Sequence, residues 1–569
     1  MTLVHETAAY RLELAPDGLS AALSSPGGDP WATLRLLAAF DTVQGPDETL
    51  AVEPPRVIVP GVFEIVRRST RWEHALLWLT CRDEGVAVSA RVRGRGDLTD
   101  VHLLGGRSLI PGRPTGFLPS GSAFRTLFSP NPGDPGRLTR RAGETAVIGV
   151  SGDGLPGRGH WFFTPAPLSL WLTTADVDEP AAVDGGWVGL SLAAPLDWLT
   201  FVQLAYVPAD RGFSLRLEYD GHMRLDGGGD APEVTITPAV PDPYIGLRRH
   251  RDDLAARRLA PAVVARETPD WWRRPIFCGW GAQCRLARRN GVRAADQATQ
   301  ANYDAFLAHL EREGLVPGTI VIDDKWQRAY GTNQPDPGKW PDLRAWIAER
   351  HARGQKVLLW WKAWDPEGLA PELCIRNSDG VPVAVDPTNP AARAALAEIV
   401  AALISPPGLD ADGLKIDFTA RTPSGAGLTT HGPGWGIALL HELLAVVHAA
   451  AKQAKPDALL ITQTPHPNFV DVTDMVRLND MLRLDDPPPF PPVVRQMRYR
   501  AEVVRAACPE VLIDTDDWCA PNLAEWREYL TEKRALGVPS LYYADALDLT
   551  GESFEPEDYE ALREAWSTA

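Results

Sequence analysis

The chain has 569 residues, which is too long for a single hydrophobic core and indicates several domains. Its hydrophobic fraction of 44% and charged fraction of 23% are ordinary for a folded protein, and they exclude a fibrous or wholly disordered chain. The formal net charge of −17 repels phosphate backbones, so we expect no nucleic-acid partner.

The first residues lack the features of a signal peptide. They read Met1-Thr2-Leu3-Val4-His5, without a basic start or a long apolar stretch. No window approaches ~18 uninterrupted apolar residues, which argues against a membrane span. The six cysteines are scattered without a Cys-x-x-Cys pair, a pattern typical of reduced thiols in a cytoplasm. We therefore expect a cytoplasmic protein with no membrane partner and no bound cofactor or metal.

Residues 1 to about 240 contain short segments in which apolar and polar side chains alternate, broken by glycine, proline and aspartate. Examples are residues 10–14, 57–59, 75–80, 86–92 and 201–207. Period-two alternation at short spacing indicates antiparallel strands with one buried face. Long patterns of helical period are absent there. We therefore predict an amino-terminal antiparallel β-sandwich over residues 1–243.

The pattern changes after the proline-rich stretch 238–243, where we predict a linking helical segment over residues 244–272, with a helix at 244–266. Eight apolar stretches of strand length follow, at 276–280, 319–323, 356–361, 413–417, 458–462, 475–478, 511–514 and 540–543. Segments of helical period lie between them, at 297–313, 342–353, 390–403, 436–454, 493–507 and 523–536. The connection between the fifth and sixth strands is short enough to lack a full helix.

Apolar strands that alternate with helices indicate a parallel sheet. Eight such units in about 300 residues fit a closed (β/α)₈ TIM barrel over residues 273–569. An open doubly wound sheet is the alternative, but no glycine-rich nucleotide motif follows the first strand. The chain ends just after the eighth barrel helix, so we expect no carboxyl-terminal β-domain.

Polar side chains follow several predicted strands, at the end of a barrel where active sites lie. Strand two runs into Asp323 and Asp324, strand four into Asp417, and strand six into Asp480. A bend after strand two would present both of its carboxylates to one ligand. Sugars bind by stacking on aromatic rings and by hydrogen bonds to carboxylates. The aromatic candidates at this rim are Trp280, Trp326, Trp361 and Trp364.

Asp417 is the strongest candidate for a catalytic carboxylate. Lys415 precedes it by two residues, so both side chains leave the strand on the same face. A neighbouring ammonium favours the ionised carboxylate that a nucleophile requires, although a buried structural pair is the alternative. Retaining glycosidases need a second carboxyl group as acid/base, roughly 5–5.5 Å away. We choose Asp480, with Asp474 and Asp471 as competitors; if Asp474 precedes strand six, it lies at the opposite end of the barrel.

These motifs together resemble glycoside hydrolase family 36, the melibiase-type retaining α-galactosidases of clan D, which combine a β-supersandwich with a (β/α)₈ barrel. The segment 323–326 is similar to the family's Asp-Asp-Gly-Trp motif, which implies that Asp323 and Asp324 bind sugar hydroxyls. The segment 415–417 is similar to Lys-Trp-Asp, which implies Asp417 as nucleophile and Lys415 as a sugar-binding cation. The segment 385–390 also resembles the family's Leu-Asp-Leu-Thr-Asn-Pro.

The segment 478–480 falls where the family carries a Ser-Asp-Asn triplet, which implies Asp480 as acid/base. The chain departs from the family at strand five, where Thr462-Gln463-Thr464-Pro465-His466 replaces Cys-Ser-Gly-Gly-Gly-Arg. It also departs after strand four, where Thr419 replaces the Asn that follows Lys-Trp-Asp-Met. These departures leave the identity of the sugar open. We expect Gln463 and Arg477 to contact the substrate.

The resulting prediction is a retaining α-glycoside hydrolase of the α-galactosidase type, acting through a covalent glycosyl–Asp417 intermediate on a small or oligomeric α-glycoside. A glycosyl transferase of the raffinose-synthase type would use the same residues. A catalytically inactive carbohydrate-binding protein is a further alternative. So is a metal-dependent barrel hydrolase built on Asp485, Asp486, Asp514, Asp516 and Asp517, although no His-Glu-x-x-His motif accompanies them. We expect the sandwich to form one wall of the site or of a homo-oligomer interface.

Overall fold

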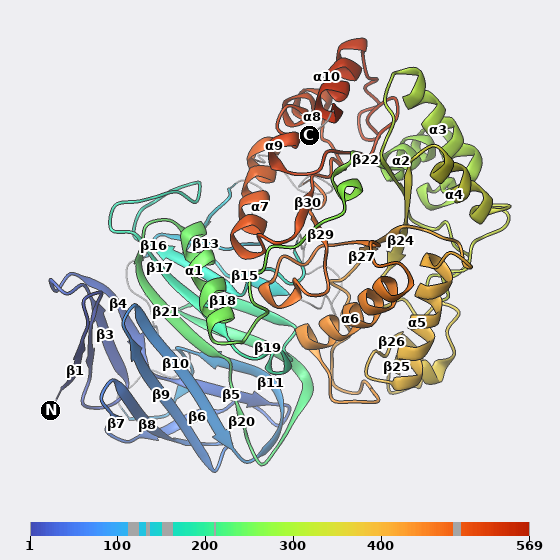
Figure 1. Cartoon of the computed structure of the whole chain (residues 1–569). Coiled ribbons are helices and arrows are strands. Elements are labelled where there is room, and N and C mark those ends of the chain that lie inside the picture. Colours follow the sequence, from blue (N-terminus) through green and yellow to red (C-terminus); the bar gives the residue numbers. More distant parts are fainter. Residues whose placement is uncertain are drawn as a thin grey trace.

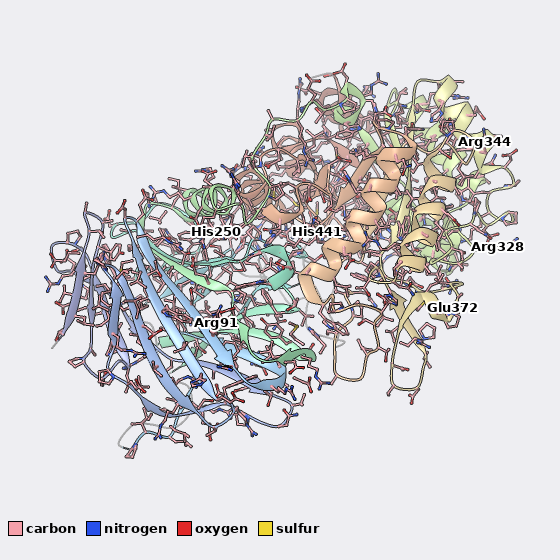
Figure 2. All side chains as sticks on the ribbon, turned by 60° about the horizontal axis from the view of Figure 1, so that its bottom comes forward. Arg91, His250, Arg328, Arg344, Glu372 and His441 are labelled. Atoms are coloured by element: carbon pink, nitrogen blue, oxygen red, sulfur yellow. The ribbon has the colours of Figure 1, made fainter. Side chains whose placement is uncertain are left out.

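The computed structural model describes residues 2–111, 124–131, 137–150, 163–209, 212–481 and 491–567. A β-rich amino-terminal half and a barrel of alternating strands and helices lie side by side (Figure 1). Helix α1 (Pro243–Ala256) connects the two halves. In Figure 2, His250 marks this helix above the sandwich strands, and His441 marks a barrel helix.

Three sheets form the amino-terminal half, and apart from one parallel pair their strands are antiparallel, as predicted. The first sheet contains β1 (Leu3–Glu6), β2 (Arg11–Leu14), β3 (Ser20–Ser24) and β4 (Pro30–Arg35). The second contains β6 (Glu48–Val52), β7 (Arg56–Val59), β8 (Val62–Ser69), β9 (His74–Arg82), β10 (Gly85–Arg93), β12 (Arg107–Ser108), β13 (Thr126–Phe128), β14 (Arg140–Arg141), β16 (Ser169–Thr173), β17 (Trp187–Ala193), β20 (Gly229–Asp230) and β21 (Glu233–Val240). The third contains β5 (Ala38–Thr42), β11 (Arg95–Leu103), β15 (Ala146–Val150), β18 (Gln203–Ala209) and β19 (Gly212–Asp226).

Alternation in the sequence becomes alternation of burial in these strands. In β9, Ala75, Leu77 and Leu79 are buried, whereas the residues between them are only partly buried. A strand places successive side chains on opposite faces, so one face of the sheet enters the core and the other remains accessible. The one helical element in the described part of this half is the short 3₁₀ helix η1 (Leu196–Trp198).

Helix α1 begins where the sequence predicts and ends earlier. The Asp242 carboxylate accepts hydrogen bonds from Tyr244 N and Ile245 N and thereby caps the first turn. The helix ends at Ala256 rather than at 266, because Arg258 takes a left-handed φ of 58° and Pro261 has no N–H to donate. The 3₁₀ helix η2 (Asp270–Arg273) then leads into the barrel.

All eight predicted barrel strands are confirmed and pair in parallel. They are β22 (Ile276–Cys278), β23 (Thr319–Ile322), β24 (Lys356–Lys362), β27 (Gly413–Asp417), β28 (Leu459–Thr462), β29 (Met475–Arg477), β30 (Leu512–Asp514) and β31 (Ser540–Leu541). A parallel bridge between Asp514 and Val538 brings β30 against the segment that enters β31 and closes the ring. Trp280 was predicted within the first strand but begins a helix instead.

The barrel helices are α2 (Trp280–Asn290), α3 (Gln300–Arg312), α4 (Leu343–Ala352), α5 (Pro390–Ile404), α6 (Gly436–Ala454), α7 (Val493–Ala507), α8 (Leu523–Leu530), α9 (Lys533–Leu536) and α10 (Pro556–Trp566). A hairpin of β25 (Cys374–Arg376) and β26 (Pro382–Val385) follows β24, and further 3₁₀ turns are η3 (Ala294–Gln297) and η4 (Pro371–Leu373). The fifth and sixth strands are joined only by η5 (Pro467–Phe469), as the short connection predicts. Among the described residues, α6 has the length and apolarity of a membrane span, but half of it is buried in the barrel and it packs against α5.

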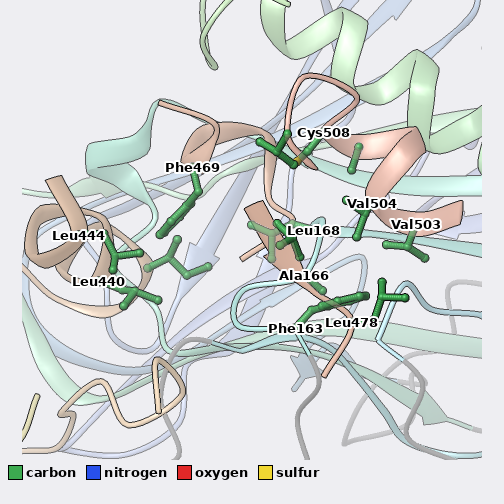
Figure 3. Packing of buried hydrophobic residues seen from close by; sticks show 14 of the residues in the cluster. Phe163, Ala166, Leu168, Leu440, Leu444, Phe469, Leu478, Val503, Val504 and Cys508 are labelled. Atoms are coloured by element: carbon green, nitrogen blue, oxygen red, sulfur yellow. The ribbon is translucent and has the colours of Figure 1, made fainter. Parts of the chain in front are cut away.

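The two halves share one apolar core. Phe163, Ala166 and Leu168 of the sandwich lie among Leu478 and Val504 of the barrel (Figure 3). Phe128 of β13 also contacts two tyrosine rings edge-on, that of Tyr244 on α1 and that of Tyr499 on α7, each with ring centroids 5.5 Å apart. The sandwich is therefore packed against the barrel.

Candidate active site

The mouth of the barrel is lined by side chains that follow β23, β27, β28 and β29. Lys415 and Asp417 lie on the same face of β27, and residues of β24 pair with both in register. Gln463 follows β28, and Arg477 ends β29. Because the carboxyl ends of the strands meet at one end of a barrel, these side chains converge.

Lys415 pairs with Asp323 at the floor of this mouth. Its ammonium Nζ lies 2.7 Å from Asp323 Oδ2, and the Cys278 thiol donates to the same oxygen at 3.0 Å. All three side chains are buried. Burial alone would lower the pKa of Lys415, but the Asp323 carboxylate raises it above its ordinary value, so the ammonium stays charged.

Asp417 lies beside this pair and accepts hydrogen bonds from several directions. Its Oδ1 accepts from Phe418 N at 2.8 Å, from Arg477 Nη2 at 3.4 Å and from Gln463 Nε2, and its Oδ2 accepts from Trp360 Nε1 at 3.2 Å. Burial opposes ionisation, but the charges of Arg477 and Lys415 and these donors hold the pKa of Asp417 below its ordinary value. The side chain is therefore a carboxylate, as a nucleophile must be.

Asp480 is connected to Asp417 through the same guanidinium. Arg477 Nη1 lies 3.1 Å from Asp480 Oδ1, while Nη2 of that group contacts Asp417. Burial, together with the negative charges of Asp516 and Asp417, raises the pKa of Asp480 to about 6 in spite of Arg477. Its side chain is 33% exposed, more than that of Asp417 at 22%, so it is open to the solvent side of the mouth. The two carboxyl groups thus differ in protonation preference.

Asp323 and Asp324 have different partners in spite of being consecutive. Asp324 N donates to Asp323 Oδ1 at 2.8 Å, and the chain then bends through Lys325, whose φ is 67°. The Asp324 carboxylate accepts from the Tyr330 hydroxyl at 2.8 Å, and burial, together with the charge of Asp323, raises its pKa to about 6. Asp323 is thus the floor of the mouth, and Asp324 belongs to its rim.

The tryptophans at the mouth divide into partly exposed and buried rings. Trp280 is partly exposed and lies edge-on against Trp518, with ring centroids 5.9 Å apart. Trp326 has no exposed surface and donates to the Trp360 carbonyl at 2.8 Å, so it supports the site from behind. The two others predicted as sugar platforms are also buried, Trp364 with its Nε1 bonded to the Thr419 carbonyl and Trp361 in the apolar core.

Sequence reasoning missed Trp360, which donates directly to Asp417. Part of the signal was present in the sequence, because period-two alternation along β24 places the Trp360 side chain on the opposite face from Trp361. The Trp360 side chain therefore enters the barrel interior, whereas that of Trp361, the residue predicted for the site, lies on the opposite face of the strand. Cys278 and Tyr330 were likewise not among the expected site residues.

The competitors of Asp480 lie away from the mouth. Asp474 precedes β29, and its carboxylate accepts from Leu460 N at 2.9 Å and from Lys452 Nζ at 2.7 Å, at the amino-terminal ends of the strands. Asp471 is 47% exposed and pairs with His441 on α6 at 3.1 Å. Neither side chain contacts Asp417, and Asp474 lies at the opposite end of the barrel, where a residue that precedes strand six was expected.

The acidic run after β30 has separate partners rather than a common centre. The Asp514 carboxylate accepts from the Ser540 hydroxyl at 2.6 Å, Asp516 pairs with Arg477 at 2.8 Å, and Asp517 pairs with Lys533 at 2.7 Å. No cluster of three or more potential metal-binding side chains occurs among residues within the described ranges. Asp485 and Asp486 lie outside those ranges.

The sandwich also reaches the mouth. Thr164 N donates to the Gln463 carbonyl at 2.9 Å, and its hydroxyl contacts the hydroxyl of Thr419. Gln463 in turn donates to the Asp417 carboxylate. The segment at Thr164 therefore supports, from the sandwich, a residue that contacts the central carboxylate.

No model of a protein family matches this sequence, and no curated protein matches it. Among solved structures, an α-galactosidase from Thermus thermophilus in complex with stachyose is similar, with a TM-score of 0.52 and 16% identity over 87% of this chain and 97% of that one. A GH31 family sulfoquinovosidase from E. rectale, in complex with an aza-sugar inhibitor, has a TM-score of 0.58 and 11% identity over 99% and 82%. A cycloalternan-forming enzyme from Listeria monocytogenes, in complex with a pentasaccharide, has a TM-score of 0.53 and 10% identity over 99% and 56%.

These likenesses show that the chain shares the fold of these three enzymes. The resemblance to glycoside hydrolase family 36, of the melibiase type in clan D, is confirmed at the level of the fold. Identities of 10–16% carry no more than the fold. What the site does must therefore be argued from its own residues.

Proposed function

We propose that the protein is a retaining α-glycoside hydrolase of the α-galactosidase type, with Asp417 as nucleophile and Asp480 as acid/base. The observation that carries the proposal is the opposite protonation preference of two carboxyl groups held by one guanidinium. Asp417 has a lowered pKa and Asp480 a raised one, and Arg477 bridges them. A pair of acids whose environments separate their pKa values is the arrangement that glycoside hydrolysis requires.

The reaction proceeds in two displacements. Asp417 Oδ2 or Oδ1 attacks the anomeric carbon while the Asp480 carboxyl group gives its proton to the departing glycosidic oxygen, so the C–O bond breaks and a glycosyl ester forms on Asp417. Asp480, now ionised, takes a proton from water, whose oxygen attacks the same carbon and displaces the Asp417 carboxylate. The product keeps the α configuration because the carbon is inverted twice.

Polar groups around the nucleophile are placed to hold the sugar. Lys415 and Asp323 present a charged pair at the floor, and Asp324 and Gln463 border the same space. Charged groups of both signs match a ring of hydroxyls, which donate and accept. The α-galactosidase from Thermus thermophilus was solved with stachyose, which supports an α-galactoside as the first substrate to test.

A panel of p-nitrophenyl α-glycosides tests the proposal, with and without EDTA, and with ¹H NMR of the first-formed anomer of the best substrate. We expect chelator-insensitive release of p-nitrophenol from one α-glycoside and an α-configured first product. A β-configured first product would exclude the covalent intermediate. Absence of release from every α-glycoside, or loss of activity in EDTA, would overturn the assignment to this class.

A further inference from the structure

Arg477 contacts three carboxyl groups, one at the end of β27 and the others in the segments that follow β29 and β30. Its Nη2 lies 3.4 Å from Asp417, and its Nη1 lies 3.1 Å from Asp480 and 2.8 Å from Asp516. Asp516 has no exposed surface, and its other oxygen accepts from Trp518 N at 2.9 Å. Both oxygens of Asp516 are thus engaged by the protein, so it holds Arg477 from behind and does not face a substrate.

The charges at this site do not balance. Among the described residues, the ion pairs of these three carboxyl groups come from Arg477, because Lys415 is paired with Asp323 and the guanidinium of nearby Arg500 donates to backbone carbonyls. Arg477 is shared by three acids, so a full negative charge on each would leave an excess in a buried environment. One of the three acids should then keep a proton, and we expect it to be the carboxyl group with the fewest hydrogen-bond donors around it. Asp417 has three further donors, which leaves Asp480 and Asp516 to compete for the same Nη1.

We propose that Asp516 is a positioning residue, which fixes Arg477 between the two catalytic carboxyl groups and, by taking the closest contact with Nη1, leaves Asp480 able to keep its proton. This inference rests on the proposed function. The shorter distance from Nη1 to Asp516, 2.8 Å against 3.1 Å to Asp480, and the complete burial of Asp516 favour that sharing. The negative charge of Asp516 also acts directly on Asp480 and raises its pKa.

Several other charged or titratable groups face Asp480 from the elements packed around it. The Arg500 guanidinium on α7 donates to three successive backbone carbonyls, those of residues 478, 479 and 480, and so fixes the loop that carries the acid. Within the described ranges, these groups are Arg477 on β29, Asp417 and Lys415 on β27, Asp516 and Cys519 after β30, and Arg500 on α7. Of the acids in this set, Asp516 is the one that shares Nη1 with Asp480.

The test is the pH profile of kcat/KM for Asp516→Asn on two glycosides of the preferred sugar, the methyl and the p-nitrophenyl. Asparagine keeps an oxygen for Arg477 but removes the competing charge, so Asp480 should lose its proton more readily. For the methyl glycoside, we expect the pH at which kcat/KM begins to fall to be lower by about one unit. At higher pH, this shift corresponds to about a tenfold loss of kcat/KM. The p-nitrophenyl glycoside, whose leaving group needs little acid assistance, should lose much less.

Asp517→Asn is the matched control, because Asp517 is equally buried and adjacent but pairs with Lys533. We expect it to lower the melting temperature without moving the basic limb. Asp516→Glu keeps the negative charge, so the basic limb of its kcat/KM profile should lie at a pH close to that of the unaltered protein. If Asp516→Asn does not fold, Asp516→Ser is measured in its place.

The inference is overturned if Asp516→Asn lowers activity by the same factor at every pH, or if Asp517→Asn moves the limb equally. An unaltered protein whose basic limb does not depend on the leaving group would instead contradict the proposed acid/base role of Asp480. The two failures are therefore distinguishable.

Discussion

Lys415 Nζ lies 2.7 Å from Asp323 Oδ2, so the lysine two residues before the central carboxylate makes its ion pair with a residue of another strand. Its charge still lowers the pKa of Asp417, but the direct donors to that carboxylate are Trp360, Gln463, Arg477 and a backbone N–H. The pair therefore neutralises the floor of the mouth and leaves both oxygens of Asp417 to the groups around the substrate.

Removing one member of this pair should destabilise the barrel. Lys415→Met leaves the Asp323 carboxylate buried without its cation, which costs about 3–5 kcal/mol of unfolding free energy. Chemical denaturation followed by tryptophan fluorescence measures this loss. Arg393→Ala, which removes the partly exposed Arg393–Glu442 pair, is the control and should change stability little. Equal losses in both variants would contradict the role of the buried pair.

Removing Asp417, the proposed nucleophile, should abolish turnover and leave the fold intact. Asp417→Ala removes a side chain that borders the mouth, so we expect kcat to fall by a factor on the order of 10³ or more with an unchanged circular dichroism spectrum. Added azide should partly restore release of p-nitrophenol and form the β-glycosyl azide, because azide attacks once from the face that Asp417 occupied. Near-normal turnover in this variant would remove the central assignment.

Much of the barrel was predictable because its strands are apolar runs that end in charged or aromatic residues. Those runs indicate eight strands without any knowledge of tertiary contacts, and the residues at their ends make Asp417 and Asp480 candidates for the site. What the sequence does not contain is the register between strands. Trp360 reaches Asp417 only because β24 and β27 pair so that Trp360 lies beside Lys415.

Contacts between distant segments were also beyond prediction. Thr164 and Thr419 are 255 residues apart, and no periodic pattern relates them. Asp516 was recognised as one of several acids, but it meets Arg477 at a backbone turn, where Asp516 itself has a φ of 36°. Such turns redirect single side chains after a strand ends, where sequence periodicity has ceased.

The acid/base pair predicts a pH profile with two limbs. On the proposed mechanism, activity requires Asp417 ionised and Asp480 protonated, so kcat/KM on a methyl glycoside should rise at a pH below the ordinary range of an aspartate and fall above about pH 6. Asp324 also has a pKa of about 6, so Asp324→Asn is the control. If the basic limb persists in Asp324→Asn, it belongs to Asp480. Its disappearance in that variant would assign it to Asp324 instead.

The barrel should depend on the sandwich for its stability. Phe128→Ala removes the ring that contacts both Tyr244 and Tyr499, at a cost of about 3–5 kcal/mol. Leu50→Ala, at a site 41% exposed in the same half, should cost little.

A protein that begins at residue 240 would expose the apolar surface around Leu478 and Val504, so we expect it to be insoluble. A soluble and fully active barrel would show that the sandwich is dispensable.

The last prediction concerns Asp480, which on the proposed mechanism must be protonated when the leaving group departs and ionised when water attacks. Asp480→Ala should harm the methyl glycoside far more than the p-nitrophenyl glycoside, because only a basic leaving oxygen needs the proton. Hydrolysis of the ester always needs the base, so on the activated substrate the glycosyl–Asp417 ester should accumulate and KM should fall. Mass spectrometry of the quenched enzyme measures that adduct. Asp474→Asn, which alters a carboxyl group at the other end of the barrel, is the control and should show neither effect. Equal losses on both substrates in Asp480→Ala would exclude Asp480 as the acid.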